Sequence, residues 1–274
     1  CINKNHFRII SSAAVRTHDK AHILKNLSKD VEFEDVTDDL ICLGIFGPKS
    51  RDLLSKITNE NLSNESFKFG TSKNIDIGSL KVWTQRLSYV GELGYELYIN
   101  KDNGKSIYDL VVETGKNFGL IHCGAHTMDT MRMESGFLHW GHDISPEENQ
   151  YQAGLNFAIS YKKSFNFIGK EKLLEIKNQK LDRRFVMLIL KDSTPGQPLL
   201  LHEEPIYLEN EIIGKTTSGN YSFNYDKNLS FGYINSKLTN EELFSRDLYI
   251  EIEKKKYKAQ ILLKPLKQSN FKDI

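Results

Sequence analysis

Hydrophobic and polar residues follow two different periods in the first part of the chain. Short runs of apolar and β-branched residues predict strands, and longer stretches with apolar residues three and four apart predict helices. The run at 41–47 is nearly all apolar, which is typical of a central strand. Strands are predicted at 6–10, 31–37, 41–47, 74–78, 80–90 and 94–100, and helices at 13–27, 47–58, 106–119, 124–136 and 167–180.

The pattern changes after Lys180, where short apolar runs are separated by glycine, asparagine, proline and aspartate. Regular short strands with turn signals between them indicate a small barrel or sandwich. We therefore expect two domains, at 1–180 and 181–274. Strands of the second domain are predicted at 183–190, 204–209, 211–219, 229–235, 248–253 and 257–266.

Composition and charge narrow the class of protein. The 274 residues carry a net charge of +1. This argues against a nucleic-acid partner, because binding the phosphate backbone requires an excess of lysine and arginine. No run of about 18 apolar residues and no secretory signal pattern is present, so no membrane partner is expected. Three widely spaced cysteines fit a reducing compartment, and we expect a cytoplasmic protein. The chain begins with Cys1, so we expect it to be N-terminally incomplete.

The stretch LSYVGELGYELYI at 87–99 carries the first candidate chemistry. In a strand after its turn, alternation puts Glu96 and Tyr98 on one face, and the preceding strand is predicted to bring Tyr89 beside them. A carboxylate flanked by aromatic rings suits a flat heterocycle with two parallel N–H donors, such as a pterin. The alternative is a solvated glutamate on the open face of an antiparallel sheet. The opposite face is predicted to carry Tyr95, Leu97 and Ile99.

Six segments in a fixed order resemble one known family and extend over most of the chain from Thr37 to Tyr233. They resemble the folate-dependent aminomethyltransferases (the family of the glycine cleavage T-protein), and most closely the carboxy-terminal folate domains of dimethylglycine and sarcosine dehydrogenases. The resemblance implies an α+β fold of three lobes, two ferredoxin-like and one a small C-terminal β-barrel. The segments are GIFGPKSRDLLSKIT, FKFGTSKNIDIG, LSYVGELGYELYI, MRMESGFLHWGHDISPEENQYQAGLNFAI, FNFIGKEKL and IIGKTTSG.

The resemblance also implies roles for individual residues. Glu96 is expected to hold the edge of the pterin of tetrahydrofolate, Tyr89, Leu97 and Tyr98 to line the site, and Phe157 to stack nearby. The family's aspartate near the folate nitrogens lies on a segment upstream of 7–10, so no catalytic residue is assigned in this chain.

This chain also differs from the aminomethyltransferases at a position that distinguishes two branches of the family. Aminomethyltransferases have an arginine where this chain has Met128, which favours the dehydrogenase branch. The function implied is capture of a one-carbon unit from N-methyl amine oxidation as 5,10-methylenetetrahydrofolate, with FAD in an upstream dehydrogenase module as partner. Alternatives are a stand-alone aminomethyltransferase or folate-dependent demethylase, or a folate-binding module without catalysis.

Two other motifs invite a functional interpretation. His139, His142 and Asp143 lie close together in HWGHD, as metal ligands often do, but no downstream partner completes the set. A turn without a metal is therefore predicted. The stretch GKTTSG from Gly214 resembles half of a phosphate loop, but Glu209 occupies the position of the first glycine. A turn between barrel strands is predicted instead.

The remaining polar and sulfur-containing residues favour structural roles. Cys42 is predicted to pack in the core, and nothing marks Cys123 as a nucleophile. The lysine run at 254–258 is predicted to be a solvated strand edge, with attraction of a folate polyglutamate tail as the alternative. Arg132 is expected to brace the core between lobes, and it cannot face Glu134 two residues along a helix.

Overall fold

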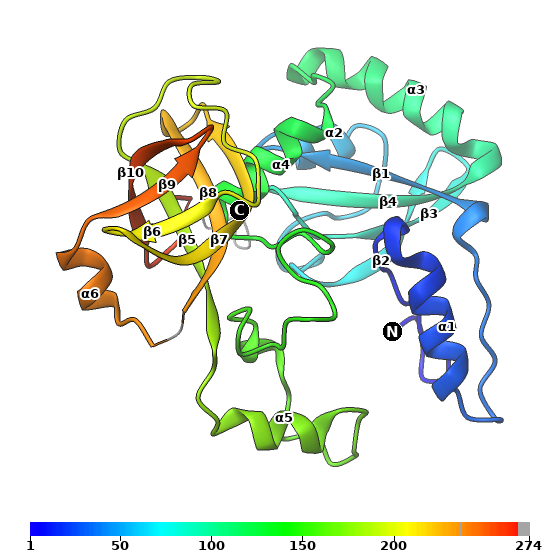
Figure 1. Ribbon diagram of the computed structural model, residues 1–274. Coiled ribbons are helices and arrows are strands. Elements are labelled where there is room, and N and C mark those ends of the chain that lie inside the picture. The colour runs from blue at the N-terminus through cyan, green and yellow to red at the C-terminus, as the bar shows by residue number, and fades with distance from the viewer. Residues whose placement is uncertain (236, 268–274) are drawn as a thin grey trace. The chain divides into compact units, whose positions relative to one another are not determined.

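The computed structural model describes residues 1–235 and 237–267 and divides into two compact units (Figure 1). Among the described residues, the first comprises 1–88 and 93–121, and the second comprises 89–92, 122–235 and 237–267. This division differs from the one expected at Lys180, and that boundary stays a prediction. No helix within the described residues is both long and apolar enough to cross a bilayer.

The first unit is built on an antiparallel sheet whose strands, in the described part of the chain, follow the order β1-β4-β3-β2. Three helices accompany the sheet, together with short 3-10 turns. The elements are α1 (Arg16–Asn26), β1 (Leu40–Phe46), α2 (Ser50–Leu54), β2 (Ser72–Ile77), β3 (Leu80–Gln85), β4 (Gly94–Asn100) and α3 (Gly104–Gly115).

One face of this sheet is covered by helices and forms the core of the first unit. Alternate residues of β4 are fully buried there, with Tyr95 and Leu97 both 0% exposed. The amphipathic helix α3 buries Ile107 and Val111 in the same hydrophobic cluster, to which α2 also contributes. Figure 1 shows α2 and α3 on one side of the sheet. The β4 residues that alternate with these buried positions, including Glu96, therefore point to the other face of the sheet, which these helices do not cover.

Two predicted strands do not form. Apart from an isolated bridge at His6 and a 3-10 turn that begins at Thr37, residues 6–10 and 31–37 lie in irregular backbone, although both are rich in β-branched and aromatic residues. Such residues favour a strand only where a neighbouring strand completes the hydrogen-bond ladder and a surface buries them. Phe7 and Ile9 have neither, since they are 66% and 69% exposed.

The apolar run at 41–47 forms strand β1, but β1 lies at an edge of the described sheet instead of at its centre. It pairs with β4, where Cys42 lies opposite Tyr98. Cys42 is exposed, so the prediction that it packs in the core is wrong. Its side chain belongs to the face opposite the core, because cross-strand partners project to the same side.

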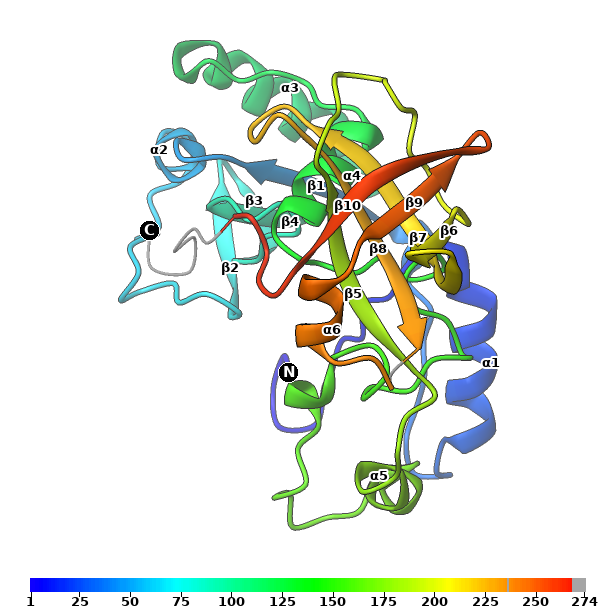
Figure 2. The ribbon, with the colours of Figure 1, turned by 60° about the vertical axis from the view of Figure 1, so that its left-hand side comes forward.

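The second unit contains a closed antiparallel barrel with the strand order β10-β5-β8-β7-β6-β9. Figure 2 shows β10 beside β5 and β9, the contacts that close the barrel. The elements of this unit are α4 (Ala125–Glu134), α5 (Lys170–Lys177), β5 (Arg183–Leu190), β6 (Pro205–Leu208), β7 (Glu211–Ser222), β8 (Lys227–Asn235), α6 (Asn240–Ser245), β9 (Leu248–Ile252) and β10 (Lys255–Leu262). The sheet of the first unit and this barrel together confirm the predicted α+β fold class.

The barrel strands bear on two predictions. Lys255, Lys256 and Lys258 pair with β9 and are exposed, and the pairing of β10 with β5 begins at Ala259. The lysine run therefore lies on a stretch of β10 that is paired along one side, as predicted for a solvated strand edge. The stretch GKTTSG is not a turn, because it lies within β7. A register shift between Thr216 and Ser218 marks a bulge there, and a bulge re-aims the side chains around it.

Helix α4 packs on β7 and β8 of the barrel. Its buried residues are Arg132, Met133 and Glu134, and Met133 joins a small apolar cluster with Leu229 and Phe231 of β8. Charged residues thus occupy two of the three buried positions of α4.

Candidate functional site

Glu96 and Tyr98 form a hydrogen-bonded pair on the open face of the first unit's sheet. Both side chains are half-buried, and the Tyr98 hydroxyl donates to Oε2 of Glu96 at 2.7 Å. The adjacent strand β3 places Gln85 opposite Glu96 and Trp83 opposite Tyr98. The Trp83 and Tyr98 rings lie 4.8 Å apart, centroid to centroid. A carboxylate is therefore held beside a small aromatic surface.

The electrostatics of the pair fix the direction of its hydrogen bond. Burial and the neighbouring Glu96 carboxylate raise the pKa of Tyr98, so the phenol stays protonated and remains the donor. Partial desolvation by neighbouring atoms and the Glu96 carboxylate also raise the pKa of the Cys42 thiol on β1, although the residue as a whole is exposed. Oε1 of Glu96 has no hydrogen-bond donor within residues 1–235 and 237–267. This oxygen is available to the N–H groups of a ligand.

The other residues predicted for the site are not part of this face of the sheet. The Leu97 side chain points into the core, on the face opposite Glu96. Tyr89 lies in the connection between β3 and β4, not on a strand, and belongs to the second unit. Its hydroxyl donates to the Leu138 carbonyl at 3.1 Å. Phe157 also belongs to the second unit and is 82% exposed.

Two residues of this face, Trp83 and Gln85, are absent from the sequence-based prediction. Alternation along β3 puts both on the other face of the sheet from the buried Val82 and Thr84. The period-two pattern of the sequence therefore contained the information needed to place them. A third residue on this face is Arg8, whose guanidinium carbon lies 4.4 Å from the centroid of the Trp83 ring. Sequence carries no signal for that contact, because 75 residues separate the two positions.

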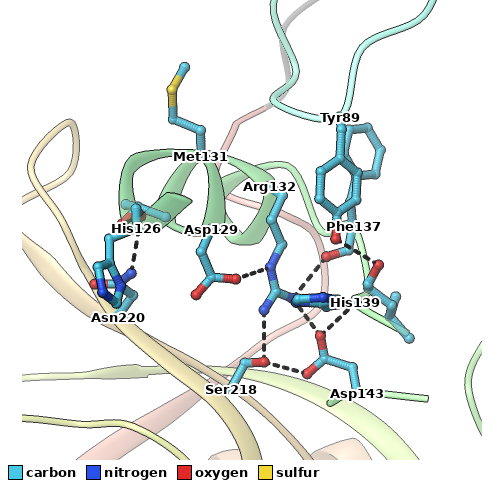
Figure 3. A network of polar contacts seen from close by, with 12 residues as sticks. Tyr89, His126, Asp129, Met131, Arg132, Phe137, His139, Asp143, Ser218 and Asn220 are labelled. Atoms are coloured by element: carbon cyan, nitrogen blue, oxygen red, sulfur yellow. Dashed lines mark hydrogen bonds and ion pairs between the residues drawn. The ribbon is translucent and has the colours of Figure 1, made fainter. Parts of the chain in front are cut away.

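The second unit contains a buried polar network around Arg132, shown in Figure 3. The Arg132 side chain is 1% exposed and forms an ion pair with the fully buried Asp143. Its Nε donates to Asp129 at 2.8 Å, and its Nη2 donates to the Ser218 hydroxyl at 2.7 Å. These bonds connect α4 to the 139–143 turn and to β7, so Arg132 braces the interior of the second unit.

Both carboxylate oxygens of Asp143 are fully used. Oδ1 accepts from the hydroxyls of Thr217 and Ser218 at 2.6 and 2.8 Å. Oδ2 accepts from Arg132 and from the His139 backbone N–H at 2.9 Å. Two of the three hydroxyls of GKTTSG, those of Thr217 and Ser218, therefore serve as donors to a buried carboxylate, and Asp143 has a structural role.

The two histidines of this turn differ in exposure, since His139 is half-buried and His142 is exposed. The His139 and His142 rings are 4.5 Å apart. Burial, His142 and Arg132 lower the pKa of His139, so its ring is neutral at pH 7. The described residues contain no group of three or more histidine, cysteine or acidic side chains arranged to hold a metal.

Glu134 has its own partners on the barrel. Its carboxylate is 1% exposed and accepts from the Ser222 hydroxyl at 2.5 Å and from the Asn224 amide at 2.9 Å. None of these partners is shared with Arg132. The expectation that two residues so close on a helix face different ways is therefore confirmed.

Two family models together match most of the chain. The model described as the GCVT N-terminal domain matches residues 1–163. The glycine cleavage T-protein C-terminal barrel domain matches residues 183–267, which contain the barrel strands.

Individual proteins are similar to nearly the whole of this chain. Human mitochondrial dimethylglycine dehydrogenase is 34% identical over 265 residues, which are 95% of this chain but 30% of that protein. An aminomethyltransferase from Caldanaerobacter subterraneus is 30% identical over 271 residues, covering 98% of this chain and 70% of that protein. The crystal structure of the glycine cleavage system aminomethyltransferase T from Bartonella henselae superimposes with a TM-score of 0.77 over 93% of this chain and 67% of that one, at 20% identity.

Proposed function

The chain belongs to the family of the glycine cleavage T-protein, and on this premise we propose that it is a tetrahydrofolate-binding domain of the aminomethyltransferase type. It captures a one-carbon unit from N-methyl amine oxidation as 5,10-methylenetetrahydrofolate. The observation that carries this proposal is the Glu96–Tyr98 pair beside Trp83 on the open face of the sheet.

The residues present fit a reduced pterin. The ring amide and the adjacent amino group of a pterin present two parallel N–H donors, which a carboxylate accepts side by side. Oε1 of Glu96 is available for this contact, and Oε2 has a lone pair besides the one that accepts from Tyr98. The aromatic rings of Trp83 and Tyr98 supply an apolar surface for a flat heterocycle.

Each residue of the face has a defined task in this proposal. Glu96 accepts the pterin N–H groups and sets the orientation of the ring. Tyr98 fixes the rotamer of Glu96 through its hydroxyl and remains a donor throughout, since its pKa is raised. Bound tetrahydrofolate supplies two amine nitrogens that condense with formaldehyde, so that two C–N bonds form and one water leaves. The gain in rate comes from proximity and orientation.

The one-carbon unit has to come from an oxidation. We propose that a flavin-dependent dehydrogenase module removes two electrons from an N-methyl amine and that hydrolysis of the resulting iminium yields formaldehyde. The match to dimethylglycine dehydrogenase supports this source, and this chain spans 30% of that protein. The module and its FAD are partners of the proposed reaction and lie outside the sequence of this chain.

Replacing Glu96 tests the proposal. Glu96→Gln keeps the size of the side chain and removes the charged acceptor, so tetrahydrofolate should bind roughly ten- to a hundredfold more weakly, as expected for one charge-assisted hydrogen bond. The measurement is anaerobic calorimetric titration with tetrahydrofolate.

The matched control is Asp76→Asn on the same open face. Asp76 lies on β2, two strands from Glu96, and is exposed. This change removes the same charge and should leave the affinity within about twofold. Equal losses in the two variants, or no loss in either, would make Glu96 a solvated surface residue and would remove the proposed site.

A stand-alone aminomethyltransferase is the second candidate. The match that covers 70% of the Caldanaerobacter aminomethyltransferase favours it. The two functions differ in their donor, because a domain that traps formaldehyde needs no aminomethyl-lipoyl carrier protein. Formation of methylenetetrahydrofolate only with such a carrier would favour this candidate, and binding without any turnover would leave a folate-binding module.

A further inference from the structure

Arg8 lies on the same face as the Glu96–Tyr98 pair. Its guanidinium carbon is 4.4 Å from the centroid of the Trp83 ring, and that ring is 4.8 Å from Tyr98. Trp83 and Tyr98 are direct partners across β3 and β4. A cation, two aromatic rings and a carboxylate therefore follow one another across this face.

The Arg8 guanidinium has no hydrogen-bond or ion-pair partner among residues 1–235 and 237–267. The side chain is half-buried. The guanidinium lies over the Trp83 ring, and its planar fork of N–H donors can bind a planar anion through two parallel bonds. Glu96 forms no ion pair with Arg8 within the described residues, where its hydrogen-bond partner is the Tyr98 hydroxyl.

We propose that Arg8 and Trp83 form a carboxylate-binding subsite for the ligand of this face. This inference rests on the proposed function, since Glu96 binds the N–H donors of the same ligand. A carboxylate pairs with the Arg8 fork, and an aromatic ring attached to it packs against the exposed part of Trp83.

Two ligands of the proposed reaction carry a carboxylate. One is reduced folate, whose glutamate follows an aromatic benzoyl ring, and the other is an N-methylated amino acid. The aromatic surface of Trp83 favours the first, because the amino acid has no ring to place against it. The test therefore compares ligands with and without each of these groups.

The decisive variant is Arg8→Gln, measured by anaerobic calorimetric titration with tetrahydrofolate and with 6-methyltetrahydropterin. The second ligand keeps the pterin and lacks the benzoylglutamate. Loss of a charge-assisted bidentate contact should weaken tetrahydrofolate about tenfold or more and leave the pterin within about twofold. Arg8→Lys should recover part of the loss, because lysine keeps the charge but not the fork.

The matched control is Lys81→Gln, which removes one positive charge from the same face of β3, two residues from Trp83. It should change neither affinity by more than about twofold. An equal effect of Arg8→Gln on both ligands, or an effect no larger than that of Lys81→Gln, overturns the subsite. Weakened binding of an N-methylated amino acid such as sarcosine, with tetrahydrofolate unchanged, overturns its assignment to folate.

A separate measurement distinguishes failure of this inference from failure of the proposed function. The chain has two tryptophans, Trp83 and Trp140, so Trp140→Phe leaves Trp83 as the single tryptophan, whose emission is excited selectively at the red edge of the absorption band. Saturable quenching by p-aminobenzoylglutamate that Arg8→Gln abolishes supports the subsite even if tetrahydropterin does not bind. Absence of such quenching in a protein that binds tetrahydropterin overturns the subsite and leaves the proposed function standing.

Discussion

Glu96 and Asp143 are both carboxylates, and their surroundings give them different roles. Asp143 is fully buried, is ion-paired with Arg132, and accepts hydrogen bonds at both of its oxygens. Glu96 is half-buried, and its Oε1 has no donor within the described residues. A carboxylate with every acceptor satisfied holds a fold together, whereas one with an unused oxygen on an open face can bind a ligand.

Removing the charge of Asp143 should destabilise the protein strongly. Asp143→Asn removes the buried counter-charge of Arg132 and leaves the partly exposed Asp129 as its ionic partner. Breaking a buried ion pair typically costs about 3–5 kcal/mol. Urea denaturation followed by circular dichroism gives the free energy of unfolding.

Glu203→Gln is the matched control for Asp143→Asn, because Glu203 pairs with Lys215 at the surface, with side chains 58% and 57% exposed. Its cost should stay below about 1 kcal/mol. A loss for Asp143→Asn as small as this would mean that Arg132 finds other partners on relaxation and that the network is not a brace.

Strand β7 is a long strand that contains one bulge. It runs for 12 residues, and its bulge turns the Thr217 and Ser218 hydroxyls toward Asp143. Gly214 allows the neighbouring strand to come close, because a Cβ at this position would lie 1.9 Å from the Tyr233 carbonyl oxygen. The glycine is thus needed for barrel packing and not for a phosphate loop.

Gly214→Ala should therefore lower the free energy of unfolding by about 1–3 kcal/mol, as expected for overpacking against rigid backbone. Thermal and urea denaturation measure the change. Gly124→Ala is the control, since no atom lies within 4 Å of its added Cβ and only the preference for glycine at a helix N-cap is lost. Indistinguishable effects of the two substitutions would show that β7 and β8 can separate enough to accept a methyl group.

The whole molecule contains separate hydrophobic cores. The core of the first unit includes Ile75 of β2, and the core of the barrel includes Ile250 of β9. Both side chains are 0% exposed. Because no residue belongs to both clusters, each unit has its own source of apolar stabilisation.

Ile75→Ala and Ile250→Ala should act on different parts of the molecule. Each creates a cavity that typically costs about 2–5 kcal/mol. Amide hydrogen exchange read by mass spectrometry should speed up in β2, β3 and β4 for the first variant, and in the barrel strands for the second. Faster exchange throughout the chain in either variant would indicate that the two units unfold as one cooperative body.

Local periodicity was sufficient to predict most elements and the shared face of one hydrogen-bonded pair in the candidate site. The period-two pattern of β4 placed Glu96 and Tyr98 on one face, and their hydrogen bond follows from that spacing. Helical spacing predicted α3, α4 and α5, and short apolar runs predicted the barrel strands. These features depend on neighbours one to four residues away, which the sequence displays directly.

The partners of those elements depend on contacts between distant positions. Residues 6–10 have strand composition but no strand neighbour, and β1 lies at an edge despite its apolar run. Arg8 meets Trp83, and Arg132 meets Ser218 across 86 positions. Alternation fixes the face on which a side chain lies, whereas the group it contacts is set by strand order, register and the bulge in β7, because these bring together residues whose separation no local pattern encodes.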